Sequence, residues 1–309
     1  MTLTVDPSIR VQSTRAAVLV PFAIITLIWG STWIVIRDQL AVVPPSWSVS
    51  YRFLTAGLAM LVYAAYRRDA LPRDGRGIGF AALLGLMQFT LNFNFVYRAE
   101  EHIASGLVAV VFALLLVPNA ILGRFFLGQM LGRQLLIGSV VAVAGVALLF
   151  VHEAQVAPRG LGDVLAGVGL TLTGVMCASV ANVMQGTATA KAYPMASVLA
   201  LAMLFGASLD GAYAWATVGP PVIELRPAYL IGVLYLGVIA SAVAFTLYFQ
   251  LIRVIGAAKA AYSSVIIPVI AMLFSTIFEH YRWSVVAVAG ALLALAGLVI
   301  ALRAPRPTR

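Results

Sequence analysis

The sequence is dominated by apolar runs, each about as long as a helix that crosses a membrane. Runs such as "GSVVAVAGVALLF" and "SVVAVAGALLALAGLVIAL" are continuous, and short polar or Gly/Pro breaks separate them along the whole chain. A bilayer core about 30 Å thick accommodates roughly 20 apolar residues per helix. Transmembrane β-strands alternate apolar and polar residues instead. The pattern therefore predicts an all-α integral membrane protein.

The breaks divide the chain into ten predicted transmembrane helices. With 62% hydrophobic and 10% charged residues and a mean hydropathy of +1.01, the composition matches no ordinary soluble domain. The predicted loops are too short to hold a separate soluble domain, so the function is expected inside the bundle. The predicted helices cover residues 17–36, 47–66, 78–97, 103–123, 134–151, 162–184, 195–216, 228–251, 257–278 and 283–302.

The basic residues indicate the orientation of the chain in the membrane. Most Lys and Arg residues fall on one side of the ten predicted helices, and both termini lie on that side. The positive-inside rule assigns it to the cytoplasm. The net charge of +9 is scattered among the loops and forms no continuous stripe, so nucleic acid is not an expected partner. Arg52, near the outer end of the second helix, is expected to snorkel to the interface, with pairing to an outer-loop acid as the alternative.

The two halves of the sequence resemble each other. The stretch "GLMQFTLNFNFVYRAEEHIASGLVAVVFALLLVPNAI" corresponds to "GVIASAVAFTLYFQLIRVIGAAKAAYSSVIIPVIAML", which aligns Gly85 with Gly237, Gly106 with Gly256, Phe112 with Tyr262 and Pro118 with Pro268. The predicted repeats are residues 17–151 and 162–302, with five helices each. An odd number of helices inverts the second repeat, an arrangement found in secondary transporters whose substrate site lies at the repeat interface. Two inverted five-helix repeats and a transport function are therefore predicted.

Short motifs connect the sequence to a known family. The first half contains "IWGSTWIVIR", "PPSWSVSYRFLTAG" and "VPNAILGRFFLGQ", and the second contains "IIPVIAMLFSTIFEH". Over nearly its whole length the chain resembles EamA-type members of the drug/metabolite transporter superfamily. The resemblance implies a multi-pass transporter in the inner membrane of a bacterium. The family often has Gly-Glu before the fifth and tenth helices, where this chain has Gly128-Gln129 and Phe278-Glu279.

The pentapeptide "WGSTW", residues 29–33, contains the first candidates for substrate binding. Trp29 lies past the midplane of the first predicted helix, which is too deep for an anchor at the membrane interface. It is either a large side chain packed against a neighbouring helix or an indole that lines a central cavity, with Ser31 and Thr32 as nearby polar contacts. Trp33, four residues further on, is better explained by packing.

The third predicted helix carries several uncharged polar residues in "MQFTLNFNFVY". Gln88 and Asn92 are four residues apart, as are Thr90 and Asn94, so two polar stripes run along the helix. Amides are costly in hydrocarbon unless paired, and such residues can simply hold helices together. Gln88 and Asn92 are nevertheless predicted to line the cavity. The matching stretch of the second half, "AFTLYFQ", supplies Tyr248.

Two prolines occupy matching places in the fourth and ninth predicted helices. Pro118 and Pro268 are expected to weaken or kink these helices. An aromatic residue precedes each proline by six positions, Phe112 in the first half and Tyr262 in the second. One interpretation is an inherited bend whose gap the aromatic ring fills. The other is a pair of gating hinges, with Phe112 and Tyr262 in contact with the substrate.

The sequence lacks the groups that several enzyme classes require. It contains no GxxxxGK[ST] phosphate loop and no HExxH motif, and its single cysteine, Cys177, lies within a predicted helix. No catalytic residue, cofactor or metal ion is therefore predicted. All eleven acids fall in predicted loops or within two turns of a helix end, so transport is expected to need no carboxylate proton relay.

The predicted cavity combines aromatic rings and amides, with Arg253 and Lys259 only at its inner rim, and therefore contains no buried charge. Such a cavity suits amphipathic or zwitterionic solutes better than sugar phosphates. The resemblance to YddG-type amino acid exporters makes export of an amino acid or similar metabolite the first hypothesis, by a monomer or weak dimer in the bilayer. Broad drug or metabolite export is the second. A lipid-modifying enzyme built on Glu100, Glu101 and His102 is a remote third.

Overall fold

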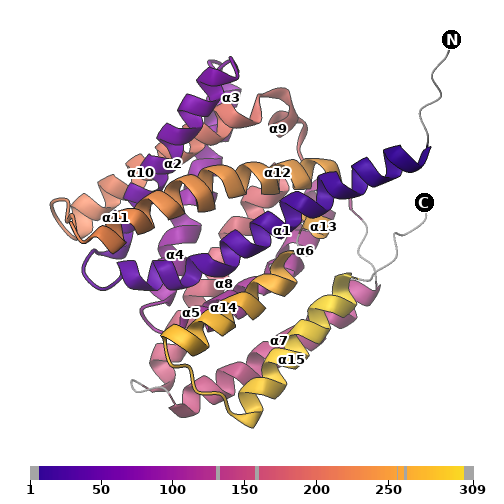
Figure 1. The fold of residues 1–309 in the computed structure, drawn as a ribbon, viewed down its shortest axis with the longest axis vertical. Coiled ribbons are helices and arrows are strands. Elements are labelled where there is room, and N and C mark those ends of the chain that lie inside the picture. Colours follow the sequence, from indigo (N-terminus) through magenta and orange to yellow (C-terminus); the bar gives the residue numbers. More distant parts are fainter. Residues whose placement is uncertain (1–6, 130–132, 157–159, 256, 261–262, 303–309) are drawn as a thin grey trace.

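A computed structural model describes residues 7–129, 133–156, 160–255, 257–260 and 263–302 of this chain, and every regular element in these ranges is helical (Figure 1). The first half contains α1 (Pro7–Gln39), α2 (Pro45–Tyr66), α3 (Gly75–Leu84), η1 (Gly85–Leu91), α4 (Asn92–Ala99), α5 (Ser105–Phe112), η2 (Ala113–Leu115), α6 (Leu116–Leu127) and α7 (Arg133–Val156). The segments α3, η1 and α4 follow one another without a break, as do α5, η2 and α6.

The second half follows a similar order, with the short helix α9 added and no 3-10 turn corresponding to η2 among its described residues. It contains α8 (Leu161–Met184), α9 (Ala188–Ala192), α10 (Met195–Thr217), α11 (Pro227–Leu234), η3 (Tyr235–Val243), α12 (Ala244–Ile255), α13 (Ala257–Ala260), α14 (Ser263–Phe278) and α15 (Val285–Leu302). Local signals place the boundaries. Pro45 and Pro227 occupy the first positions of α2 and α11, and Gly128 ends α6 in the left-handed conformation with φ +66°.

The described helices overlap the ten predicted segments, but their bounds differ and not all meet the criteria for a membrane span. Seven of the described helical stretches are long and apolar enough to cross a bilayer, and the shorter apolar helices are Leu136–His152, Ile266–Phe278 and Val285–Ala301. The prediction of an all-helical membrane protein is therefore confirmed. The count of ten spans stays a prediction.

Two of the helical stretches widen into π-helix at matching places. In η1 and η3 the backbone is wound with i→i+5 hydrogen bonds, and these segments begin around Gly85 and Gly237, which the sequence alignment of the two halves paired. A Cβ on Gly85 would lie 2.5 Å from the carbonyl oxygen of Ala202 in α10, and one on Gly237 would lie 2.8 Å from Thr55 in α2. Each π segment therefore packs closely against the second long helix of the opposite half.

The helices α7 and α15 form a separate pair at the edge of the bundle (Figure 1). Four glycines make their close approach possible: a Cβ on any of them would collide with the backbone of the partner helix. They are Gly138 and Gly145 in α7, and Gly290 and Gly297 in α15. Small residues at a helix interface are typical of packing in membranes, where van der Waals contact drives association.

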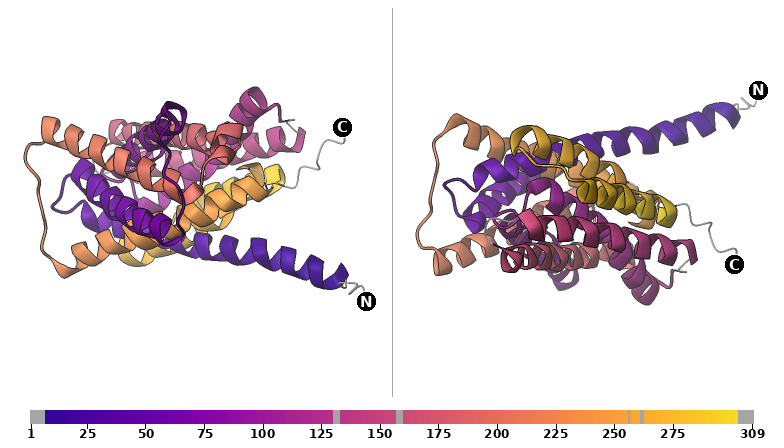
Figure 2. Two further views of the ribbon diagram at one scale, coloured as in Figure 1. Left: turned by 90° about the horizontal axis from the view of Figure 1, so that it is seen from above. Right: turned by 90° about the horizontal axis from the view of Figure 1, so that it is seen from below.

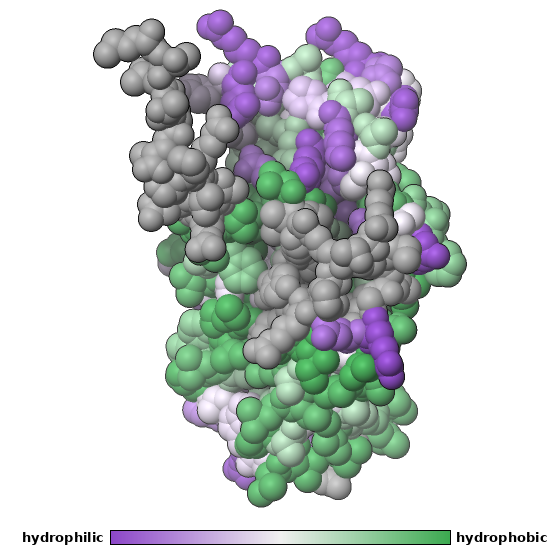
Figure 3. All heavy atoms as spheres, turned by 90° about the vertical axis from the view of Figure 1, so that its right-hand side faces the viewer, coloured by the Kyte–Doolittle hydropathy of each residue, from purple (hydrophilic) through white to green (hydrophobic). Residues whose placement is uncertain are grey.

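Both ends of the described chain lie at the same end of the bundle. Figure 2 shows the beginning of α1 and the end of α15 on that side. Figure 3 looks onto the same side, where hydrophilic residues gather toward the top, near α3 and α9, and apolar residues cover the lower part near α7 and α15. An even number of membrane crossings would produce this arrangement of the two ends.

Candidate functional site

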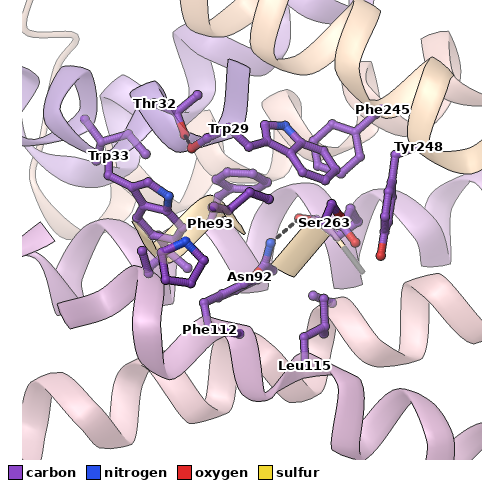
Figure 4. A pocket seen from close by; sticks show the side chains of 18 of the residues that line it. Trp29, Thr32, Trp33, Asn92, Phe93, Phe112, Leu115, Phe245, Tyr248 and Ser263 are labelled. Carbon is purple, nitrogen blue, oxygen red and sulfur yellow. Dashed lines mark hydrogen bonds between the residues drawn. The ribbon is translucent and has the colours of Figure 1, made fainter. Parts of the chain in front are cut away.

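Helices from both halves enclose a cavity of about 90 Å³. Its walls come from α1, α2, η1, α4, α5, η2, α8, α12 and α14 (Figure 4). Seven of the residues predicted to bind substrate or to act as hinges line it, namely Trp29, Thr32, Gln88, Asn92, Phe112, Tyr248 and Pro268. Pro118 is not among the lining residues. Tyr262 lies outside the described residues.

Trp29 is held in place against the second half of the chain. Its indole Nε1 donates a hydrogen bond of 3.0 Å to the carbonyl oxygen of Ala240 in η3. Its ring lies 4.9 Å from that of Tyr248 and 5.2 Å from that of Phe245, measured between centroids. The three rings come together on one side of the cavity (Figure 4). Trp29 thus both packs against a neighbouring helix and lines the cavity, so the two interpretations of this residue are compatible.

A second aromatic pair lies elsewhere in the wall. The ring centroids of Trp33 and Phe112 are 5.9 Å apart in an edge-on arrangement. Trp33 is buried, as its packing interpretation requires, yet it also lines the cavity. Its indole Nε1 is buried without a hydrogen-bond partner among the described residues. The sequence interpretation therefore missed one donor of the cavity wall.

The hydroxyl groups of the pentapeptide are already engaged by the protein. Thr32 lines the cavity, but its Oγ1 donates a hydrogen bond of 2.8 Å to the carbonyl oxygen of Trp29, one turn earlier. Ser31 is absent from the lining residues and instead forms a 2.6 Å hydrogen bond with the hydroxyl of Tyr235. The hydroxyl proton of Thr32 is therefore already used within α1, and Ser31 joins α1 to η3.

The two polar stripes of the third helical stretch have different roles. Gln88 and Asn92 line the cavity and are buried. Thr90 and Asn94 face α10, where Thr90 Oγ1 donates to the carbonyl oxygen of Gly206 over 3.2 Å and Asn94 Nδ2 donates to Asp210 Oδ1 over 2.7 Å. Thus one stripe holds helices together and the other belongs to the site. Hydrogen bonds to the protein account for Thr90 and Asn94, whereas the side-chain oxygens of Gln88 and Asn92 have no partner among the described residues.

Two amide oxygens of the cavity wall have no donor. Asn92 Nδ2 donates to the backbone oxygen of Gln88 over 3.3 Å, which orients the amide, whereas Asn92 Oδ1 and Gln88 Oε1 are buried without a hydrogen-bond partner among the described residues. A buried polar atom without a partner costs about 1–3 kcal/mol. A bound molecule that donates hydrogen bonds would recover this free energy.

The prediction that Arg52 snorkels to the interface is wrong. Its side chain is 1% exposed and lines the cavity. Nε donates to Ser241 Oγ over 2.9 Å, Nη1 donates to the Tyr97 hydroxyl over 3.4 Å, and the guanidinium carbon lies 4.3 Å from the centre of the Phe93 ring. Because α2 packs between α10 and η3, this face of the helix has no route to lipid headgroups.

The burial of Arg52 changes the electrostatic character of the cavity, which was predicted to contain no buried charge. No carboxylate among the described residues forms an ion pair with Arg52, since the closest groups are neutral hydroxyls and aromatic rings. A guanidinium has five N–H donors, and the described partners use two of them. The cavity therefore contains an arginine whose charge the surrounding side chains do not neutralise by direct contact.

The two matched prolines have different surroundings. Pro268 lies within α14 and lines the cavity. Pro118 is the third residue of α6, directly after the 3-10 turn η2, so its missing N–H falls where the α-helical pattern is already interrupted. Of these two prolines, only Pro268 lies in the cavity wall. The proposed hinge function of both remains a prediction.

A network of polar side chains joins α1, α5 and α14 beside the C-terminal end of α4. Glu279 accepts hydrogen bonds from Ser105 Oγ over 2.8 Å and from Ser275, and it lies 3.6 Å from Arg37 Nε. Arg37 also donates to the backbone oxygen of Glu100. Glu279 thus connects α1 and α5 of the first half to α14. Gln129, at the matching place in the first half, carries no charge and cannot form such an ion pair.

Glu100 follows α4 and is completely buried, although the sequence placed it in a predicted loop. Neither carboxylate oxygen has a hydrogen-bond partner among the described residues. Desolvation raises the pKa of Glu100 well above its ordinary value, and the nearby charge of Glu279 raises it further, against the opposing effects of Arg37 and Arg52. Hydropathy cannot detect this burial because the residue lies at the end of an apolar stretch.

The arrangement around Glu100 does not form the acid and histidine cluster that a lipid-modifying enzyme would need. Glu101 is exposed, and His102 Nδ1 is hydrogen bonded to Asp163 Oδ1 at 2.5 Å. The described residues contain no group of three or more His, Cys, Asp or Glu side chains suited to a metal ion. The three side chains therefore lie in different environments: Glu100 is buried, Glu101 is exposed and His102 is bonded to Asp163.

Asp210 is a second buried carboxylate. It is two turns from the C-terminal end of α10, as the sequence indicated, yet its side chain is 0% exposed between α10 and α4. Oδ1 accepts from Asn94, and Oδ2 has no hydrogen-bond partner among the described residues. Position along the helix therefore does not indicate contact with water. The expectation that transport needs no carboxylate proton relay stays a prediction.

Comparison with known proteins connects this architecture to a family. The model of the EamA-like transporter family matches residues 17–151 and again residues 165–303. Protein PagO of Salmonella typhimurium is 23% identical over 261 residues, which cover 84% of each chain. The uncharacterized inner membrane transporter YedA of Escherichia coli is 33% identical over 124 residues, 40% of each chain. The uncharacterized transporter YvbV of Bacillus subtilis is 22% identical over 94% of this chain and 92% of its own.

A solved structure has the same fold. It is described only as the crystal structure of a protein, and it superimposes with a TM-score of 0.68 at 17% sequence identity over 93% of this chain and 96% of that one. At this level of identity the likeness concerns the fold alone. The arrangement of helices around the cavity is therefore one that an experimental structure also contains.

Proposed function

Because this chain belongs to the EamA-like transporter family, we propose that it is a secondary transporter of small amphipathic metabolites, with amino acids as the first candidates. The observation that carries the proposal is the cavity between the halves, in which buried amide oxygens without donors lie beside aromatic rings. Such a site offers hydrogen bonds to a polar head and an apolar surface to a side chain.

The size of the cavity favours a small solute. Its volume of about 90 Å³ is well below the roughly 300 Å³ at which pockets for drug-sized ligands begin. A broad drug exporter, the second candidate, would need a cavity several times larger. The mostly apolar wall still favours solutes with an apolar portion, which drugs and aromatic amino acids share.

The two halves are arranged as alternating access would require. Both halves contribute helices to the cavity wall, and η1 and η3 each pack against the second long helix of the opposite half. Inverted repeats that exchange such contacts can open a central site first to one side of the membrane and then to the other. The inner membrane is the proposed location, since YedA is named an inner membrane transporter. Both termini are proposed to lie in the cytoplasm, because most Lys and Arg residues fall on their side of the predicted helices.

Counterflow in proteoliposomes tests the proposal. Vesicles preloaded with unlabelled phenylalanine would receive labelled phenylalanine, tryptophan, threonine or a nucleotide sugar in separate runs, without a proton gradient. We expect accumulation of the amino acids and none of the nucleotide sugar, because the cavity is too small for the latter. Protein-free vesicles serve as the control. Accumulation of the nucleotide sugar, or of no amino acid, would refute the amino acid assignment.

A competition run separates the two candidate substrates. Unlabelled bulky lipophilic cations would be added in excess to the phenylalanine exchange. We expect little inhibition, because Arg52 contributes a positive charge to the wall of a small cavity. Strong inhibition together with transport of the cations would favour a broad drug exporter.

A further inference from the structure

Arg52 is the least explained group in the membrane-embedded part of the protein. It is 1% exposed, and its direct partners are the hydroxyls of Ser241 and Tyr97 and the face of Phe93. Removing a charge from water without a counter-charge is expensive, and ionisable side chains inside membranes are usually paired or functional. Neutral hydroxyls orient a guanidinium but do not neutralise it.

The closest acidic candidate does not provide a direct counter-charge. Glu100 is near enough to interact electrostatically with Arg52, but no atoms of the two side chains approach within the 4 Å of an ion pair. Arg52 also faces the cavity, which a ligand can enter, whereas Glu100 is not one of the lining residues. The charge of Arg52 is thus available to a molecule bound in the cavity.

The same cavity contains acceptors that complement this donor. Gln88 Oε1 and Asn92 Oδ1 are buried without donors, and both residues line the cavity together with Arg52. A carboxylate fits a guanidinium, and an ammonium group donates to amide oxygens. A molecule with both groups on one carbon would satisfy the two ends of the polar wall. The aromatic rings of Trp29 and Phe245 remain for its side chain.

From these contacts we infer that Arg52 binds the carboxylate of the transported molecule, so that the substrate class is restricted to small amphipathic carboxylates, above all α-amino acids. The inference rests on the proposed function, because it names the chemistry of the same cavity. Compounds that keep the apolar group but lose the carboxylate are expected to bind far more weakly. Compounds that keep the carboxylate but lose the ammonium group bind more weakly.

Ligand binding to the purified wild-type protein in detergent tests the inference without measuring transport. The shift in melting temperature and the quenching of tryptophan fluorescence would be titrated with phenylalanine, 3-phenylpropionate, phenylalaninamide and phenethylamine. We expect phenylalanine to bind most tightly, 3-phenylpropionate to follow, and the two compounds without a carboxylate to bind at least tenfold more weakly than phenylalanine. Phenylalaninamide or phenethylamine binding as tightly as phenylalanine would overturn the inference, even if counterflow succeeded.

Two substitutions examine the residue itself. Arg52→Gln should weaken phenylalanine binding roughly 10- to 100-fold and bring the preference for phenylalanine over phenylalaninamide close to one, because the charge-assisted hydrogen bonds are lost. Arg52→Lys should retain part of the preference. A merely structural arginine would change stability and leave the preference intact. The wild-type titrations decide the question even if both variants fail to fold.

Arg98→Gln is the matched control. Arg98 belongs to α4 and its Nη2 donates to Ser46 and Tyr213, but it is not a cavity-lining residue. The substitution removes the same charge from the molecule, so it should leave the preference for the carboxylate unchanged. Counterflow of amino acids combined with equal binding of the amide would show that the proposed function holds and the Arg52 inference fails. Absence of binding by any carboxylate compound would overturn the inference independently of transport.

Discussion

At the scale of single residues, two asparagines illustrate how neighbouring positions serve different purposes. Asn92 faces the cavity with a free amide oxygen, and Asn94 donates to the buried Asp210. They lie two positions apart, so their side chains leave the helix in different directions. Substitution of each by alanine should therefore separate an effect on substrate from an effect on stability.

We predict that Asn92→Ala lowers amino acid counterflow about tenfold at low substrate concentration and changes the melting temperature little, because it removes an acceptor that the folded protein leaves unused. Asn94→Ala should instead reduce the free energy of unfolding by about 1–3 kcal/mol, because Asp210 loses its hydrogen-bond donor. Transport rates and thermal unfolding in detergent measure both effects. Equal loss of transport in the two variants at equal protein amounts would contradict the assignment of the cavity face.

Glu100 predicts a dependence of stability on pH. Its pKa is raised in the folded protein, so the folded state keeps a proton that the unfolded state has released. The contribution is therefore complete below the ordinary carboxyl pKa near 4.5 and is lost as the pH rises through the raised value. Arg37 and Arg52 oppose this loss, and Glu279 increases it.

We expect Glu100→Gln to flatten the fall of the melting temperature as the pH rises above the ordinary carboxyl pKa near 4.5, because glutamine cannot release a proton. The measurement is thermal unfolding in detergent at several pH values, with the wild-type protein beside the variant. Glu101→Gln, which changes an exposed neighbour, is the control and should follow the wild-type curve. Parallel curves for wild type and Glu100→Gln would show that the carboxyl group does not titrate in this range.

At the scale of helices, the π segments depend on glycines that allow close contact with a neighbouring helix. The backbone of η1 approaches α10 so closely at Gly85 that any side chain would meet the carbonyl oxygen of Ala202. The same helical stretch contains Gly79, where a Cβ would meet nothing within 4 Å. The two positions therefore form a natural pair for comparing close packing with helix propensity.

We predict that Gly85→Ala destabilises the protein by about 1–3 kcal/mol, because the added methyl group forces η1 away from α10. Gly79→Ala should be neutral or slightly stabilising, since alanine favours helix without a steric conflict. Melting temperatures in detergent and the yield of monodisperse protein report the difference. Equal melting temperatures and yields for the two variants would mean that α10 can move away from Gly85 without loss of stability.

At the scale of the whole molecule, the cavity belongs to neither half alone. The aromatic group around Trp29 joins α1 to α12, and Arg52 of α2 is bonded to Ser241 of η3. Each of these contacts crosses from the first half to the second. A movement that opens the cavity must therefore alter contacts between the halves, which is the type of rearrangement that inverted-repeat transporters use.

The sequence by itself determined the membrane-spanning helical character, the twofold repetition and the family. Apolar length fixes which segments enter a bilayer, because each backbone polar group must be satisfied within its own helix. Several cavity residues were also predictable, such as Gln88, Asn92 and Tyr248, since amides and rings within an apolar helix require partners. Each of these conclusions follows from the residues of a single helix, without knowledge of its neighbours.

The tertiary structure alone decided the charge of the cavity and the environment of the acids. Hydropathy placed Arg52 near a helix end, where lipid contact would allow snorkelling, but the packing of α2 against η3 turns it into the cavity wall. Glu100 and Asp210 are likewise buried by helices that lie far away in the sequence. The physical reason is that a side chain responds to whatever lies beside its own face of the helix, and only the assembled bundle determines whether that neighbour is lipid, water or another helix.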